Sequence, residues 1–164
     1  MLEETGRASE APFESTVDIR TSAHIPERYI PVNAQRMEMY KKISLIRDTG
    51  DAEDILDEFI DRFGEPPHET ADLIRISLLR SLASQCRISK VEFTNQIIFH
   101  LERMDLGIWS ELFGQFPTLA FRAAATPSVT CRLTRADKPL EVAISILDEY
   151  KKLLSEEAKG AQNE

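Results

Sequence analysis

Two helical segments that meet at a Gly-Glu-Pro-Pro break constrain this chain more than any other feature. The first, residues 51–63, is apolar on one face and charged on the other, and Gly64 followed by Pro66 and Pro67 ends it. The second, residues 67–86, is apolar around most of its circumference. A helix of that kind must be covered on several sides, so we expect it to be the buried central helix of a domain.

The remaining periodic segments predict an α+β fold. Further helices are predicted over residues 33–44, with Asn33 as N-cap, 105–116 and 138–156, and strands over residues 16–25, 89–95, 96–102, 118–124 and 128–134. Helices come first and most strands follow. We therefore expect N-terminal helices packed on a small, mostly antiparallel sheet, with a helix at the C-terminal end.

The ends of the chain differ from its middle. Residues 1–14 are polar without a period, and residues 156–164 are similar. We expect a flexible leader or linker, one domain over residues 15–155, and a flexible tail.

Composition narrows the possible partners and compartment. Twenty basic and 28 acidic residues give a net charge of −8, which opposes non-specific binding to nucleic acid. No apolar run is long enough to span a bilayer, and the first residues do not form a signal peptide. Cys86 and Cys131 lie far apart without a C-x-x-C pair, which is typical of free thiols in the reducing cytoplasm.

Motifs that carry catalytic or nucleotide-binding chemistry are missing. The sequence contains no phosphate-binding loop, no G-x-G-x-x-G turn, no G-x-S-x-G elbow and no H-E-x-x-H helix. Its three histidines, His24, His68 and His100, are widely separated. We expect no catalytic residue, no cofactor and no metal ion.

The charged face of residues 51–63 has three interpretations. A catalytic pair of Glu58 and Asp61 would need burial or unequal surroundings to separate the two pKa values, and a solvent-facing row gives neither. A plain solvated face is one alternative, since Glu58 and Arg62 are spaced to support the helix by an ion pair. The other is a surface that docks against Arg or Lys of another domain.

Three stretches occur in a characteristic order: AHIPERYIPVNAQRMEMYKKIS, AEDILDEFIDRFGEPP and RISKVEF. Together they resemble the C-terminal domain of the bacterial transcription-repair coupling factor family. The likeness extends over residues 17–154 and is sharpest in two motifs. One comprises Tyr29, Ile30, Pro31, Asn33, Arg36 and Tyr40 to Ile43, and the other Glu58 to Gly64. From Asn95 onward only the pattern of strands and helices agrees.

The resemblance implies a function that composition does not. The full-length family protein is an ATP-driven DNA translocase that displaces stalled RNA polymerase and recruits excision repair. In that family this domain is non-catalytic and docks on a UvrB-like N-terminal module of the same protein, which masks the surface that recruits UvrA. The family's E-x-x-D-R contact motif matches Glu58, Asp61 and Arg62. UvrA, RNA polymerase and DNA would then be partners only through the parent protein.

Two other functions stay open at this level. A nucleic-acid-binding accessory domain would use basic residues around the central helix and the sheet: Arg75, Arg80, Arg87, Lys90, Arg132 and Arg135. The net charge of −8 stands against it. A small hydrolase would need carboxylates that converge in a buried cleft.

Overall fold

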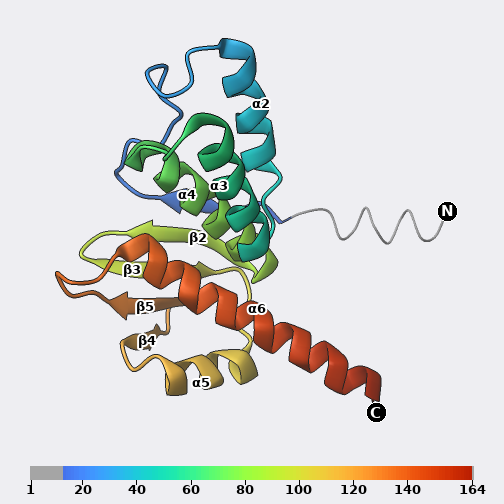
Figure 1. The fold of residues 1–164 in the computed structure, drawn as a ribbon. Helices are drawn as coiled ribbons and strands as arrows, with labels where there is room; N and C mark the ends of the chain where they lie inside the picture. Colours follow the sequence, from blue (N-terminus) through green and yellow to red (C-terminus); the bar gives the residue numbers. More distant parts are fainter. Residues whose placement is uncertain (1–12, 164) are drawn as a thin grey trace.

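The computed structural model describes residues 13–163, which form five helices and five strands (Figure 1). Of the predicted leader, residues 1–12 lie outside this range. Within it, no helix has the length and apolar character needed to cross a membrane. The elements are β1 (Thr16–Asp18), α2 (Asn33–Ser44), α3 (Thr49–Phe63), α4 (His68–Gln85), β2 (Ile88–Phe93), β3 (Gln96–Leu101), α5 (Leu106–Gln115), β4 (Leu119–Arg122), β5 (Ser128–Arg132) and α6 (Pro139–Asn163).

The strands form one sheet in the order β1-β2-β3-β5-β4, in which only β1 and β2 are parallel. Val91, Phe99 and Val129 stand opposite one another on neighbouring strands and are fully buried. α4 packs against β1 and β2, and α6 packs against α4 and α5 (Figure 1). The predicted α+β class is therefore confirmed, including the mostly antiparallel sheet and the C-terminal helix.

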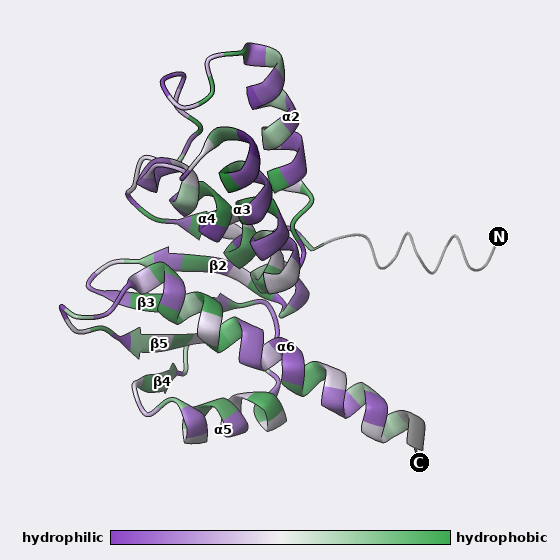
Figure 2. Cartoon of the chain, in the orientation of Figure 1, coloured by the Kyte–Doolittle hydropathy of each residue, from purple (hydrophilic) through white to green (hydrophobic). Residues whose placement is uncertain are grey.

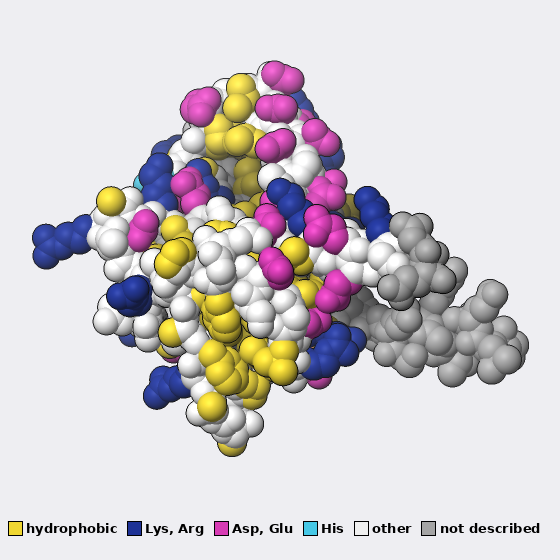
Figure 3. Space-filling view, turned by 90° about the horizontal axis from the view of Figure 1, so that it is seen from below, with side chains coloured by type: hydrophobic (Ala, Val, Ile, Leu, Met, Phe, Trp, Pro, Cys, Tyr) yellow, Lys and Arg dark blue, Asp and Glu magenta, His cyan; other side chains and the backbone are white. Residues whose placement is uncertain are grey.

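The hydrophobic residues gather between the helices and the sheet, whereas α2 is largely hydrophilic (Figure 2). The indole of Trp109 lies in this core, with ring centroids 6.2 Å from Phe99 and 5.4 Å from Tyr150. Some apolar side chains reach the surface at the end of the molecule that carries α5 and β4 (Figure 3). There Leu106 is 70% exposed and Phe121 is 45% exposed.

The predicted strand over residues 16–25 is wrong beyond Asp18. After this residue the chain leaves the sheet edge and runs along the start of α4. The His24 amide donates to the Glu69 carbonyl (3.2 Å), and the Thr70 hydroxyl donates to the His24 carbonyl (3.0 Å). Partners on a helix thus replace the ladder bonds that a longer strand would make.

Residues of the Y-I-P…N-x-x-R motif hold this extended segment against α2. The Tyr40 hydroxyl accepts a hydrogen bond from the Ile25 amide (2.8 Å). The Arg36 guanidinium donates to the carbonyls of Ile30 (2.8 Å) and Pro31 (3.0 Å). In this segment, Tyr40 and Arg36 therefore form hydrogen bonds with backbone amide and carbonyl groups that are not bonded within a strand or helix.

The start of α2 differs from the prediction. Val32 is the N-cap and makes no side-chain capping bond, and Asn33 is the first helical residue. The Asn33 side chain instead accepts a hydrogen bond from Arg36 (3.1 Å). On this helix Met39 and Ile43 are buried, whereas Met37 is 52% exposed.

Helix α3 has the predicted end and an earlier start. Asp48 caps it by accepting a hydrogen bond from the Asp51 amide (2.8 Å). Gly64 ends it with φ of 86°, a left-handed conformation that favours glycine. The Tyr29 hydroxyl donates to the Gly64 carbonyl (2.6 Å) and fixes this end in place.

Phe59 holds α3 on the core. It is fully buried and stacks on Tyr29, with ring centroids 6.0 Å apart, while Phe63 packs beside it at 6.3 Å. Ile60 belongs to the apolar face of residues 51–63, from which the sequence predicts packing on the core, but its side chain is 38% exposed. The prediction that Ile60 packs on the core is therefore wrong.

Helix α4 is buried as predicted. Eight of its side chains are buried, and the helix packs against α2, α3, β1, β2 and α6. Helix α6 continues to Asn163, so the residues predicted as a flexible tail are helical as far as Asn163.

We expect Phe59→Ala to lower the free energy of unfolding by about 3–5 kcal/mol, because it removes a fully buried ring and leaves a cavity. Ile60→Ala is the matched control on the same helix, and we expect a loss of no more than roughly 1 kcal/mol. Urea titration followed by circular dichroism measures both. Equal losses would contradict the assignment of the buried face of α3.

Candidate protein-docking site

Four charged residues of α2 and α3 form a closed network on the surface. Glu58 accepts hydrogen bonds from Lys42 (2.6 Å) and from Arg62 (2.7 Å) through the same carboxylate oxygen. Arg62 also donates to both oxygens of Glu38 (2.9 and 3.2 Å), and Lys42 lies 3.2 Å from Glu38. We call Glu38, Lys42, Glu58 and Arg62 the charge network. It has no net charge and joins α2 to α3.

The network perturbs the acids that it contains. Hydrogen bonds from Arg62 and then Lys42 lower the pKa of Glu38 to about 2. The bond from Lys42, followed by that from Arg62, lowers the pKa of Glu58. Both carboxylates are therefore ionised at neutral pH. Their side chains stay 43% and 29% exposed, so solvent weakens each pair.

Asp61 stands apart from the charge network. It is exposed and forms no ion pair or side-chain hydrogen bond with any residue between 13 and 163. Asp54 and Asp57 are also exposed, and their spacing of three and four residues places them on the same face of α3 as Asp61. We call these three residues the acidic strip. The exposed Ile60 lies on the same helix.

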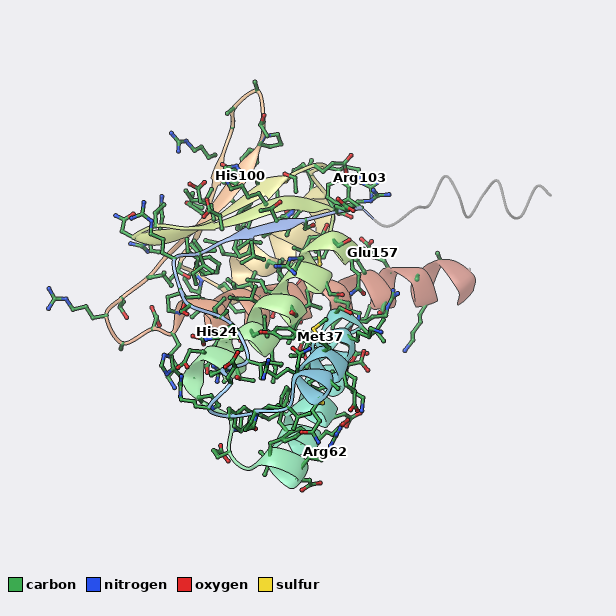
Figure 4. The ribbon with its side chains drawn as sticks, turned by 90° about the horizontal axis from the view of Figure 1, so that it is seen from above. His24, Met37, Arg62, His100, Arg103 and Glu157 are labelled. Atoms are coloured by element: carbon green, nitrogen blue, oxygen red, sulfur yellow. The ribbon has the colours of Figure 1, made fainter. Side chains whose placement is uncertain are left out.

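Of the three predicted site residues, Glu58 and Arg62 belong to the charge network, whereas Asp61 does not. The predicted pair between Glu58 and Arg62 is present, but both also bind α2. Glu38 and Lys42 are not among the predicted site residues. Their spacing of four residues predicts an ion pair within α2. This spacing does not predict that α3 lies beside α2. Figure 4 shows Arg62 among the side chains of these helices, far from His100 on the sheet.

The geometry offers little for acid–base or nucleophilic chemistry. Asp61 is exposed, Glu58 is paired with two cations, and neither lines the cavities found at the groove beside α4 or beside Arg75. Both cysteines are buried, and burial raises the pKa of Cys86 to about 12, which keeps it a thiol. In the same part of the chain, His, Cys, Asp and Glu side chains form no group of three that could hold a metal ion.

Comparison with protein families decides what kind of domain this is. Residues 19–104 match the family model described as the TRCF domain, which is more than half of the 164 residues. The chain belongs to the TRCF domain family. The matched range contains α2, α3, α4 and the β2–β3 hairpin, and so includes the charge network and the acidic strip. The family resemblance found in the sequence is confirmed.

Curated relatives of this TRCF domain are transcription-repair-coupling factors. The Bacillus subtilis protein is 32% identical over 80 residues, which are 49% of this chain and 7% of that protein. The Staphylococcus aureus protein is 34% identical over 90 residues (55% and 8%). The Mycobacterium tuberculosis protein is 26% identical over 135 residues (81% and 11%). The chain therefore spans only a small part of the length of these relatives.

A solved structure extends the likeness in fold to the second half of the chain. The crystal structure of the C-terminal domain of transcription-repair coupling factor matches with a TM-score of 0.73 at 23% identity. The match covers 88% of this chain and 94% of that chain. The sheet and the C-terminal helix therefore share the arrangement of that domain.

We expect the charge network to make the stability of this TRCF domain depend on acid pH. A carboxylate whose pKa is lowered on folding contributes stability above its ordinary value of 4.5, and this is lost as the pH falls toward the folded value, about 2 for Glu38. The variant Glu38→Gln/Glu58→Gln should therefore lose less stability than the natural chain between these two values. Urea unfolding across this pH range measures the difference.

The control is Glu53→Gln, which changes an exposed acid of α3 that pairs with no cation in the described part of the chain. It should keep the pH profile of the natural chain. If the double glutamine variant also kept that profile, the network would contribute nothing to folding.

Proposed function

We propose that this TRCF domain is a non-catalytic docking domain of a transcription-coupled DNA-repair translocase. It binds, through the outward face of α3, the UvrB-like N-terminal module of the same protein and masks the surface that recruits UvrA. The contact is autoinhibitory and opens when the parent protein engages RNA polymerase on DNA. These events take place in the cytoplasm. Membership in the TRCF domain family supports this placement in DNA repair.

The acidic strip supplies the charges for the proposed contact. Asp54, Asp57 and Asp61 present three carboxylates on one face of α3. None of them forms an ion pair with a Lys, Arg or His side chain of residues 13–163. A partner surface that carries Lys or Arg would supply the missing opposite charge and set the register of binding. Ile60 adds an exposed apolar group on the same helix that a partner could cover.

The charge network supports docking in a different way. Its four members already satisfy one another, so a partner need not neutralise Glu58 or Arg62 to bind. Their side chains instead hold α3 in one orientation relative to α2. We infer that Glu58 and Arg62 shape the docking surface as positioning residues and that Asp61 contacts the partner most directly.

The acids of the acidic strip are exposed, and ion pairs that they form with a partner would be weak enough for the contact to dissociate. Exposed ion pairs each contribute roughly 0.2–1 kcal/mol, so a contact built on a few of them can be displaced. Coupling between sites in molecular switches is typically about 1–3 kcal/mol, which a handful of such pairs supplies.

We expect Asp61→Lys to weaken binding of the isolated UvrB-like module by about tenfold, because it replaces an attraction of roughly 1 kcal/mol or less by a repulsion. The stability of the domain should not change, since Asp61 has no ion-pair partner among residues 13–163. Isothermal titration calorimetry measures the affinity, and thermal unfolding checks the fold. Glu111→Lys, an exposed acid on α5, is the control with the same change of charge.

Glu58→Lys should weaken both binding and folding, because it also breaks the charge network. Undiminished binding by both Asp61→Lys and Glu58→Lys would remove the outward face of α3 as the docking site.

A further inference from the structure

A second surface, separate from the acidic strip, has the opposite chemistry. A groove of about 840 Å³ lies between residues 13–15, the α2–α3 connection and the C-terminal half of α4. Its walls carry Arg47, Arg80 and Arg87, five serines and one carboxylate, Glu14. This volume falls within the range of about 300–1,000 Å³ that is common for ligand sites.

The three guanidinium groups of the groove are unneutralised by the carboxylates of residues 13–163. None of Arg47, Arg80 and Arg87 forms an ion pair with them. Arg75, on the same helix as Arg80, pairs with Asp72 (3.2 Å) and lies 3.6 Å from Glu141. The chain has a net charge of −8, yet these three neighbouring arginines form no ion pair with residues 13–163. Their positions therefore indicate a local site for an anion.

The hydroxyl groups of the groove divide into two sets. Three serines donate to backbone carbonyls: Ser15 to Ile88, Ser44 to Lys41 and Ser84 to Phe13. Ser77 and Ser81 donate to no residue in the described range, and the Ser81 hydroxyl accepts from Gln85 (3.2 Å). Two hydroxyl protons are therefore left for a ligand that accepts hydrogen bonds.

The backbone conformation and the aromatic contact of Arg87 indicate a binding role for its side chain. It is the one non-glycine residue with positive φ (57°) in the described chain, at the C-terminal end of α4, where glycine is the common choice. Its guanidinium lies 5.4 Å from the centroid of the half-buried Phe13 ring. Proteins that bind single-stranded nucleic acid combine a positively charged groove with aromatic side chains on which bases stack, and both are present here.

We propose that this groove binds a single-stranded nucleic-acid segment. Arg47, Arg80 and Arg87 contact its phosphates, and Phe13 lies beside an unpaired base. The inference is independent of docking by α3. It also narrows the basic set considered from the sequence, because Arg75 is paired and Lys90 lies 3.5 Å from Asp18, whereas Arg80 and Arg87 share the groove.

Fluorescence anisotropy with a short labelled oligothymidylate tests the proposal on the natural chain, Arg80→Gln and Arg75→Gln. Each phosphate contact on a single strand contributes about −0.7 to the slope of log affinity against log salt, so three contacts give about −2. Arg80→Gln should bind at least about threefold more weakly, with a slope smaller in magnitude by about 0.7. Arg75→Gln makes the same charge change on the same helix and should bind like the natural chain. Circular dichroism checks the fold of each variant.

Three results would overturn the proposal. One is the absence of binding at low salt, and another is an equal loss in Arg75→Gln and Arg80→Gln, which would mean that only overall charge matters. The third is equal competition by an acidic peptide or by a duplex of matched charge, since neither offers an unpaired base to Phe13.

Discussion

Helix α4 must be covered on several sides, and this requirement arranges the other elements around it. Because this helix is apolar around most of its circumference, it needs cover from the sheet on one side and from α2, α3 and α6 on the others. Phe59, stacked on Tyr29, holds α3 in that cover. The outward face of α3 is then left to solvent, and its charges become available for contacts outside the domain.

Two kinds of charged surface follow from this arrangement. Where α3 lies beside α2, acids and bases pair across the two helices and form the charge network. Where α3 has no neighbour, the acidic strip stays unpaired in the described chain, and it carries the proposed docking. The groove beside α4 instead carries arginines that form no ion pair within the described chain, so the domain presents two surfaces of opposite charge.

Features set by local chemistry could be predicted from the sequence, and features set by neighbours could not. The end of α3 follows from Gly64 and the two prolines, and the pair between Glu58 and Arg62 follows from helical spacing. The early end of β1, the exposure of Ile60 and the part played by Glu38 depend on which element lies alongside. Spacing along one helix carries no information about a second helix.

The central claim is that the outward face of α3 contacts the UvrB-like module. At 18.6 kDa the chain is small enough for titration of its amide resonances by nuclear magnetic resonance. We expect the unlabelled module to shift or broaden resonances of α3 around Asp54, Asp57 and Asp61, while those of β4 and β5 stay in place. Changes confined to the sheet or to α5, with α3 unaffected, would contradict it.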